Sequence, residues 1–207
     1  MSSPRRALLV IDVQNDYFGG QLPIAYPPVA DSLPKIVRAM DAARAHGVPV
    51  VVVQHSAPAQ APVFADGSAG WQLHPQVAAR PHDLLLSKSR PSAFAGTELA
   101  GWLDARAIDT LTVAGYMTHN CNASSIYDAF HRGLQVEVLG DASGALPYAN
   151  AAGQASAEEI HRVFGVVFHS NFAALADTAQ WIEALRAGAA LPRDNVLQSS
   201  RRARGLA

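Results

Sequence analysis

Residues 113–121 read Val113-Ala114-Gly115-Tyr116-Met117-Thr118-His119-Asn120-Cys121, and they contain the only cysteine of the chain. A short β-branched run at residues 110–114, typical of a buried strand, leads into them. Beyond them, Ile126, Ala129 and Phe130 recur at helical spacing until Gly133. Cys121 is therefore expected in the first turn of a helix that follows a strand. Free backbone N–H groups and the helix dipole favour a thiolate there and supply oxyanion donors, although a lone cysteine can also be a small buried hydrophobe.

The length and composition are those of one globular domain. The chain has 207 residues, a formal net charge of −1 and 49% hydrophobic residues, which fits a single α/β domain with a well-buried core. The near-neutral charge argues against nucleic-acid and membrane-surface partners. One cysteine excludes an internal disulfide, and the apolar run at residues 7–13 is too short to span a membrane. We expect a cytoplasmic protein.

Short apolar runs alternate with helical patterns along the chain. Strands are predicted at residues 7–11, 48–53, 84–86, 110–114, 136–139 and 165–168. Helices are predicted after Asp31 or Ser32, after residues 94–98, after Cys121, after Ser156 and after Asp177, with a short one within residues 72–79. This alternation predicts a three-layer α/β/α fold with a mostly parallel six-stranded sheet.

One domain is expected over residues 1–190. Residues 191–207 are polar and Arg-rich and lack periodicity, so a mobile tail is expected there. Residues 56–82 lack clear periodicity and carry several prolines, which is typical of a functional lid.

Three polar residues follow three different predicted strands. Asp12 follows the first strand, Lys88 the third and Cys121 the fourth. Right-handed crossovers place all βα turns of a parallel sheet at one edge, so these residues are expected to share one site. Two carboxylates, Asp12 and Asp16, stand where a dinucleotide fold would have a glycine-rich phosphate turn. Because they would repel phosphate, their charge argues against a nucleotide-binding fold. Taken alone, Asp12 could be a solvated turn residue and Lys88 an exposed lysine.

These residue types suit hydrolysis through a cysteine nucleophile. Asp12 could accept the thiol proton and pass it to a leaving amine. The Lys88 ammonium would lower the thiol pKa and balance the aspartate charge. The expected reaction is acyl transfer from an amide to water through a thioester, with no histidine base.

The chain resembles the isochorismatase-like cysteine hydrolases over roughly residues 7–187. The motifs that carry the resemblance are Val10-Ile-Asp12-Val-Gln-Asn-Asp16-Tyr-Phe18, Lys88 with Ala93-Phe94-Ala-Gly-Thr97-Glu-Leu99, Gly115-Tyr-Met-Thr118-His-Asn-Cys121 and Gly140-Asp141-Ala142. The resemblance implies a catalytic triad of Asp12, Lys88 and Cys121. It also implies a cis peptide between Tyr116 and Met117, an oxyanion site at the backbone of Met117 and Cys121, and a homodimer or higher homo-oligomer.

The metal site of nicotinamidase-like members has no clear counterpart in this sequence. Those members carry an Asp-x-His pair and a later histidine after the second strand, whereas this chain reads Val53-Gln54-His55-Ser56. His74 and His82 lie in the same region, but no pair shows the required spacing. We therefore expect neither a metal nor another cofactor.

Three functions remain open at this stage. The first is a metal-free cysteine hydrolase that cleaves a small amide or related C–N bond. The second is an isochorismatase-type vinyl-ether hydrolase that uses Asp12 as proton donor, and the third is a non-catalytic family member. The candidate substrate-binding residues lie on or near turns at the active edge: Gln14, Phe18, His55, Phe64, Trp71, Tyr116, His119 and Tyr148.

Overall fold

A computed structural model describes residues 3–206 of the chain. Its central sheet has six parallel strands in the order β3-β2-β1-β4-β5-β8. The strands are β1 (Arg6–Ile11), β2 (Val50–His55), β3 (Leu84–Lys88), β4 (Thr110–Tyr116), β5 (Gln135–Gly144) and β8 (Ala174–Ala176). The predicted three-layer α/β/α fold is therefore confirmed.

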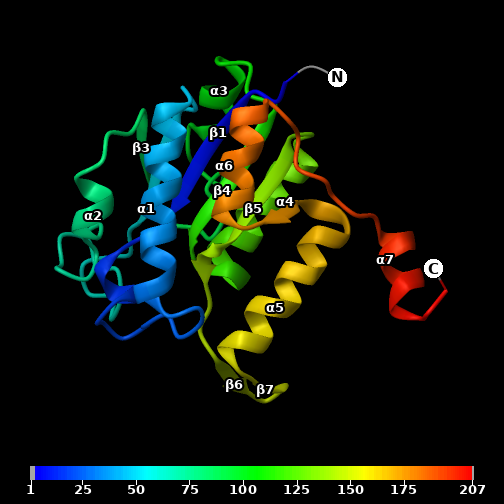
Figure 1. The fold of residues 1–207 in the computed structure, drawn as a ribbon. Helices are drawn as coiled ribbons and strands as arrows, with labels where there is room; N and C mark the ends of the chain where they lie inside the picture. Colours follow the sequence, from blue (N-terminus) through cyan, green and yellow to red (C-terminus); the bar gives the residue numbers. More distant parts are fainter. Residues whose placement is uncertain (1–2, 207) are drawn as a thin grey trace.

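Helices cover both faces of this sheet, and two elements project from it (Figure 1). The helices are α1 (Val29–Ala45), α2 (Pro75–Ala78), α3 (Leu99–Asp104), α4 (Ala123–His131), α5 (Ala157–Val167), α6 (Thr178–Ala187) and α7 (Val196–Ala203), with helical turns η1 (Asn15–Tyr17), η2 (Thr118–Asn122) and η3 (Phe168–Phe172). A hairpin of β6 (Tyr148–Asn150) and β7 (Gly153–Ala155) extends below the sheet, and α7 stands to its right (Figure 1). None of the helices in residues 3–206 combines the length and apolar character that crossing a membrane requires.

Strand β1 lies at the centre of two hydrophobic cores. Leu8 and Val10 pack in the core beneath α1 and α6, whereas Leu9 and Ile11 pack in the core beneath α3 and α4. All four are fully buried. A continuous apolar run suits this position, because successive side chains of a central strand point to opposite faces and both faces are covered.

The approach of β4 to β1 requires glycine at position 115. Gly115 pairs with Ile11 in the parallel register and has a φ of +101°, which side chains rarely adopt. A Cβ atom added there would collide with the backbone of Ile11. The close approach brings the turn after β4 beside Asp12, the residue that follows β1.

Two sequence predictions about the later part of the chain differ from the structure. The strand predicted at residues 165–168 is wrong, because that segment completes α5 and begins η3. The sixth strand is instead β8, which pairs in parallel with β5 at the edge of the sheet. The tail also contains the helix α7, capped by the Asn195 side chain, where no regular structure was expected. Mobility of the tail stays a prediction.

A buried ion pair joins β1 to β5 through the core. Arg6 Nη2 lies 2.7 Å from Glu137 Oε1, and both side chains are nearly inaccessible. Thr112 Oγ1 donates to Glu137 Oε2 at 2.8 Å, and Trp181 Nε1 donates to the same oxygen at 3.1 Å. Every group around the carboxylate is therefore paired, which a buried charge requires.

Replacement of Glu137 by alanine is expected to lower the free energy of unfolding by about 3–5 kcal/mol, because it leaves the Arg6 charge buried and unpaired. Urea unfolding followed by tryptophan fluorescence measures this loss. The matched control is Asp109→Ala, which removes the exposed ion pair with Arg5 and should cost no more than about 1 kcal/mol. Equal losses in the two variants would contradict the assigned role of the buried pair.

Candidate active site

Asp12 and Lys88 form a fully buried ion pair at the carboxyl edge of the sheet. Lys88 Nζ lies 2.7 Å from Asp12 Oδ2, and neither side chain is exposed. Asp12 follows β1 with a left-handed φ of 50°, a conformation that aspartate tolerates better than most residues. Lys88 is the last residue of β3. Two strands that are not neighbours in the sheet thus supply the two charges.

Burial and mutual attraction set the charges of this pair. Burial raises the pKa of Asp12 above its usual value, and the Lys88 ammonium opposes that rise. Burial acts to lower the pKa of Lys88, but the charges of Asp12 and Cys121 and the hydrogen bonds to them together outweigh it, so the pKa is raised. The lysine therefore keeps its proton, whereas Asp12 is a stronger base than an exposed aspartate.

Cys121 lies against the same ammonium. Its Sγ atom is 3.3 Å from Lys88 Nζ, and the residue is buried within η2, the π-helical turn that leads into α4. Burial raises the pKa of the thiol, and the charge of Asp12 raises it further, whereas Lys88 lowers it. The expected lowering of the thiol pKa is therefore wrong for the resting site: desolvation and the carboxylate outweigh the ammonium, and the sulfur keeps its proton.

Side chains within and around η2 hold the turn that carries Cys121 in place. The peptide between Tyr116 and Met117 is cis, as the family resemblance implies. Asn122 Nδ2 donates to the Gly115 carbonyl at 2.8 Å. Ser125 Oγ donates to the Cys121 carbonyl at 2.7 Å. The sequence reasoning missed Asn122 and Ser125, because their polar side chains in an amphipathic helix give no signal of burial.

Gln14 makes hydrogen bonds to the backbone of two segments. Its Nε2 donates to the carbonyls of His55 and Trp71 at 2.9 and 2.6 Å, and its Oε1 accepts from the His55 N–H at 2.9 Å. The side chain is completely buried. The amide thus joins the end of β2 to the loop that carries Trp71, and the expected role of Gln14 in substrate binding stays a prediction.

Tyr116 also belongs to the core. It is fully buried, and its hydroxyl shares a 2.8 Å hydrogen bond with Ser32 Oγ on α1. Burial raises the pKa of its hydroxyl to about 12, against the effect of that hydrogen bond. The hydroxyl is thus held by α1, and the expected role of Tyr116 in substrate binding stays a prediction.

The loop over residues 56–82 packs aromatic side chains beside the site. Phe64 lies against Tyr17 with ring centroids 5.0 Å apart, and its N–H donates to Asp16 Oδ2 at 2.6 Å. Trp71 Nε1 donates to Ser56 Oγ at 2.6 Å. Phe18 packs on His74 at 4.3 Å. Tyr17 and Asp16 were not among the predicted site residues, although they lie in the motif at residues 10–18.

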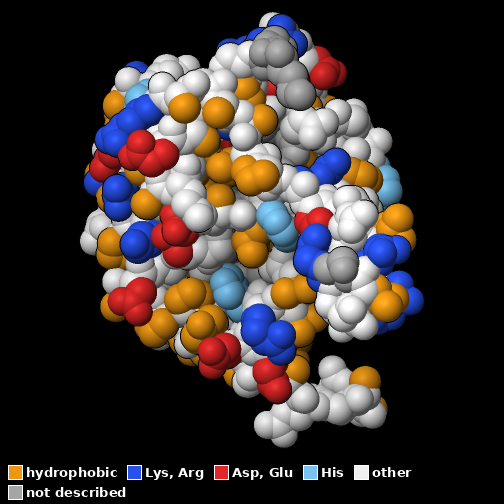
Figure 2. Space-filling model, turned by 45° about the vertical axis from the view of Figure 1, so that its right-hand side comes forward, with side chains coloured by type: hydrophobic (Ala, Val, Ile, Leu, Met, Phe, Trp, Pro, Cys, Tyr) orange, Lys and Arg blue, Asp and Glu red, His pale blue; other side chains and the backbone are white. Residues whose placement is uncertain are grey.

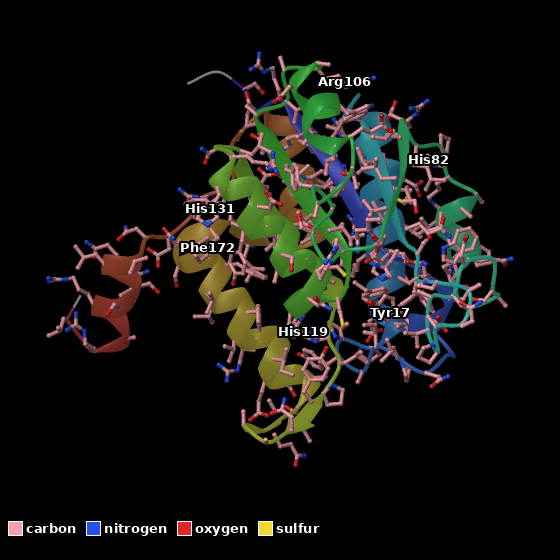
Figure 3. All side chains as sticks on the ribbon, turned by 180° about the vertical axis from the view of Figure 1, so that it is seen from behind. Tyr17, His82, Arg106, His119, His131 and Phe172 are labelled. Carbon is pink, nitrogen blue, oxygen red and sulfur yellow. The ribbon has the colours of Figure 1, made fainter. Side chains whose placement is uncertain are left out.

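His119 and Tyr148 form a second aromatic wall. Their ring centroids are 4.8 Å apart at nearly a right angle, and the Tyr148 hydroxyl lies 3.8 Å from Met117 Sδ. Both ring nitrogens of His119 are buried and find no partner among the described residues. Burial, with a smaller effect of His161, lowers the pKa of His119 to about 4, so the ring is neutral. Figure 3 shows His119 and Tyr17 at the same end of the molecule, far from Arg106.

The three histidines of residues 55–82, the region where nicotinamidase-like members carry a metal site, are placed apart. His55 Nδ1 faces Lys88 Nζ at 3.3 Å. His74 Nδ1 accepts from the Gln76 N–H at the start of α2, and His82 Nδ1 lies 3.1 Å from the Arg80 carbonyl. Within residues 3–206, no three histidine, cysteine or acidic side chains are grouped as a metal ion would require.

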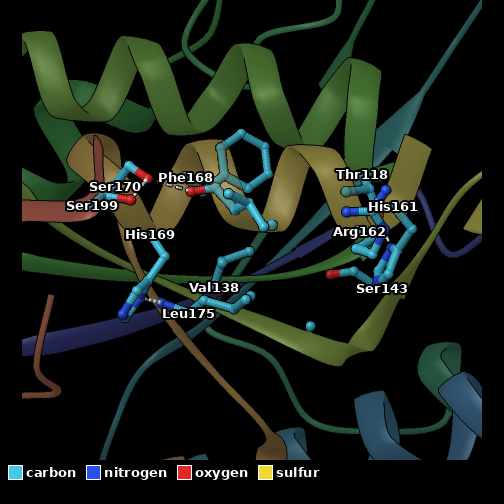
Figure 4. Close-up of a pocket in the computed structure, with 13 residues that line it drawn as sticks. Thr118, Val138, Ser143, His161, Arg162, Phe168, His169, Ser170, Leu175 and Ser199 are labelled. Atoms are coloured by element: carbon cyan, nitrogen blue, oxygen red, sulfur yellow. Dashed lines mark hydrogen bonds between the residues drawn. The ribbon is translucent and has the colours of Figure 1, made fainter. Parts of the chain in front are cut away.

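A cavity of about 400 Å³ lies beside α5. Thr118 and His161 line one end, Phe168 and Leu175 its apolar middle, and Ser199 of α7 the other end (Figure 4). Thr118 Oγ1 lies 2.9 Å from His161 Nδ1. Asp12, Lys88 and Cys121 do not line this cavity.

Comparisons with known proteins agree with this geometry. Residues 6–180 match the isochorismatase domain family. A secreted isochorismatase effector of Verticillium dahliae is 30% identical over 82% of this chain and 90% of its own length. A ureidoacrylate amidohydrolase of Methylobacterium radiotolerans is 31% identical over 86% of this chain and 78% of its own length.

Solved structures match over nearly the whole chain. An isochorismatase-type protein of Burkholderia xenovorans LB400 is 62% identical, with a TM-score of 0.98 over 99% of this chain and 98% of that one. A cysteine hydrolase from Pseudomonas syringae pv. phaseolicola 1448A is 25% identical, with a TM-score of 0.83 over 91% of this chain and 95% of that one.

The charge arrangement predicts opposite effects of two substitutions on the thiol. Asp12→Asn removes the anion that raises the pKa of Cys121 and leaves Lys88 beside it, so alkylation by iodoacetamide at pH 7.5 should become faster. A pKa lower by about one unit gives about tenfold more thiolate. Lys88→Met should make alkylation slower. The single thiol makes the measurement direct, and slower alkylation of Asp12→Asn than of the wild type would contradict the assigned charges.

Proposed function

The chain belongs to the isochorismatase family, and we propose that it is a cysteine hydrolase that cleaves a small amide or related C–N bond. The observation that carries this proposal is the contact of three groups in a buried site: Lys88 Nζ lies 2.7 Å from Asp12 and 3.3 Å from Cys121. A base, a nucleophile and a cation that balances their charge are what thioester chemistry needs. Relatives named as ureidoacrylate amidohydrolases and streptothricin hydrolases support the choice of a C–N bond.

The resting protonation states suggest how the first step begins. Cys121 holds its proton and Asp12 is an unusually basic carboxylate. As the sulfur attacks the substrate carbonyl carbon, its proton passes to Asp12. The electron pair of the carbonyl double bond moves to oxygen, where the N–H groups of Met117 and Cys121 are the predicted donors. Lys88 stabilises the negative charge while it moves from Asp12 to sulfur and on to oxygen.

The second half of the reaction reverses these transfers. The tetrahedral intermediate collapses, the C–N bond breaks, and the leaving nitrogen takes the proton from Asp12. This leaves a thioester between Cys121 and the acyl group. Asp12 then takes a proton from water, which attacks the thioester carbon, and the proton returns to the sulfur as the acid leaves. The carboxylate thus serves as base and acid in turn.

Vinyl-ether cleavage is the alternative reaction in this site. Asp12 would then act as proton donor, and Cys121 would take no covalent part. Burial raises the pKa of Asp12, which favours proton donation by its acid form. The contact of Cys121 with Lys88 favours the amide reaction, because an ether hydrolase has no need of a thiol there. A non-catalytic member would have no need of the buried charge pair at all.

Replacement of Cys121 by alanine separates these functions. For the proposed reaction we expect loss of at least about 10⁴-fold in kcat, because the nucleophile is gone. The wild-type enzyme is incubated with an amide that it hydrolyses, and the reaction is quenched in acid. The peptide that contains Cys121 should then have gained the mass of the acyl group. Hydrolysis of isochorismate that Cys121→Ala retains in full would instead establish the ether reaction.

We also propose that the chain acts as a homo-oligomer and that its substrate is a small molecule. The cytoplasmic location stays a prediction. The support is an apolar face on α5, β8 and α7, where large side chains lie open to solvent. Val166 is 56% exposed, and Leu197 is 62% exposed. Figure 2 brings this side of the molecule forward. Exposed apolar patches of this kind mark protein interfaces.

The double variant Val166→Asp, Leu197→Asp should weaken such an assembly, because it places charges in the apolar face. Sedimentation velocity at micromolar concentration should show the wild type as a dimer or larger and the variant as a monomer. The matched control is Leu85→Asp, which changes an exposed leucine on β3 at the opposite edge of the sheet. A monomeric wild type would contradict the proposal.

A further inference from the structure

We infer that His55 is a positioning residue that holds the Lys88 ammonium toward Asp12 and Cys121. His55 stands at the end of β2 and pairs in register with Lys88 on β3. Its Nδ1 atom lies 3.3 Å from Lys88 Nζ. Neither the proposed reaction steps nor the family resemblance uses this side chain.

The hydrogen-bond capacity of Lys88 requires this third partner. An ammonium group has three N–H donors and no acceptor. One donor meets Asp12 Oδ2 at 2.7 Å, and another meets Cys121 Sγ at 3.3 Å. The third meets His55 Nδ1. Because the Lys88 side chain has no exposure to solvent in the resting site, a donor left without an acceptor would carry a full desolvation cost.

The same contact fixes the protonation state of the histidine. Lysine can only donate, so Nδ1 of His55 must be the unprotonated nitrogen and the hydrogen must be on Nε2. Burial and the Lys88 charge lower the pKa of His55, and Asp12 opposes them. The charged groups that face His55 are thus Lys88 of β3 and Asp12 after β1. A neutral ring is therefore maintained beside the cation.

The histidine is itself held firmly. The Gln14 side chain accepts from the backbone N–H of His55 and donates to the backbone carbonyl of His55, both at 2.9 Å. Its ring meets the edge of Phe64, with centroids 5.6 Å apart and planes at 76°. A fixed backbone and a ring packed against Phe64 hold Nδ1 of His55 toward Lys88, whose charge then lies beside Asp12 and Cys121. His55 was predicted to bind substrate, and this placement assigns its Nδ1 atom to the lysine instead.

The contact can be tested without any substrate. In an NMR titration, the His55 signals, identified by their absence from His55→Leu, should show the Nε2–H tautomer and a midpoint below the ordinary value of about 6.5. In Lys88→Met the midpoint should rise by about one unit or more, because the cation is gone and Asp12 remains. An unchanged midpoint, or an Nδ1–H tautomer in the wild type, would overturn the assignment.

The positioning role is tested by matched variants at one site. His55→Asn places an amide oxygen near the position of Nδ1, whereas His55→Leu offers no acceptor. We expect kcat/KM for amide hydrolysis to fall about 10- to 100-fold in His55→Leu with KM nearly unchanged, and to recover most of that loss in His55→Asn. The control His46→Leu changes an exposed histidine at the end of α1 and should have no effect. Equal activity of the leucine and asparagine variants would exclude the role.

This role of His55 rests on the proposed hydrolase function, but alkylation of Cys121 separates the two. Loss of the third acceptor lets the ammonium move from the sulfur, so iodoacetamide should react more slowly with His55→Leu than with His55→Asn or wild type. That result without amide hydrolysis would reject the proposed function and keep the positioning role. Equal alkylation rates would reject the role. If His55→Leu fails to fold, His55→Gln, whose amide extends toward the Nε2 position, takes its place in the comparison.

Discussion

A single buried ammonium group organises the active edge of this protein. Lys88 Nζ contacts the carboxylate after β1, the thiol after β4 and the imidazole at the end of β2. A cation without solvent contact is stable only if all three of its donors are satisfied. The acceptors come from three separate strand ends, so the sheet must bring those ends together before the charge can be buried. Close pairing of β1 with β4, which Gly115 permits, is part of that requirement.

Much of the site could be predicted from the sequence, because it depends on topology. Alternating strands and helices place βα turns at one edge, and this places Asp12, Lys88 and Cys121 together without any knowledge of their side-chain contacts. The capping boxes at Ser156 and Asp177 likewise mark true helix starts. The error at residues 165–168 has a physical cause. That β-branched run has the composition of a strand, but it continues a helix already begun at Ser156, and propensity yields to that context.

The quantities that depend on burial could not be predicted in the same way. The sequence places Cys121 beside Lys88 but does not reveal how little water reaches the thiol, so the direction of its pKa shift was inferred incorrectly. The same limit applies to Gln14 and Tyr116. Each lies close to the site in sequence, and only the structure reveals their hydrogen bonds to the Trp71 carbonyl and to Ser32.

The order of the strands gives the ion pair a mechanical meaning as well. β3 is an edge strand that pairs only with β2, and Lys88 reaches past β2 to the residue after β1. This buried ion pair therefore fastens the outermost strand to the middle of the sheet. Edge strands open more readily than central ones, and each such opening would part Lys88 from Asp12 and Cys121. The integrity of one sheet margin thus keeps the three groups together, and a local opening of β3 is enough to separate them.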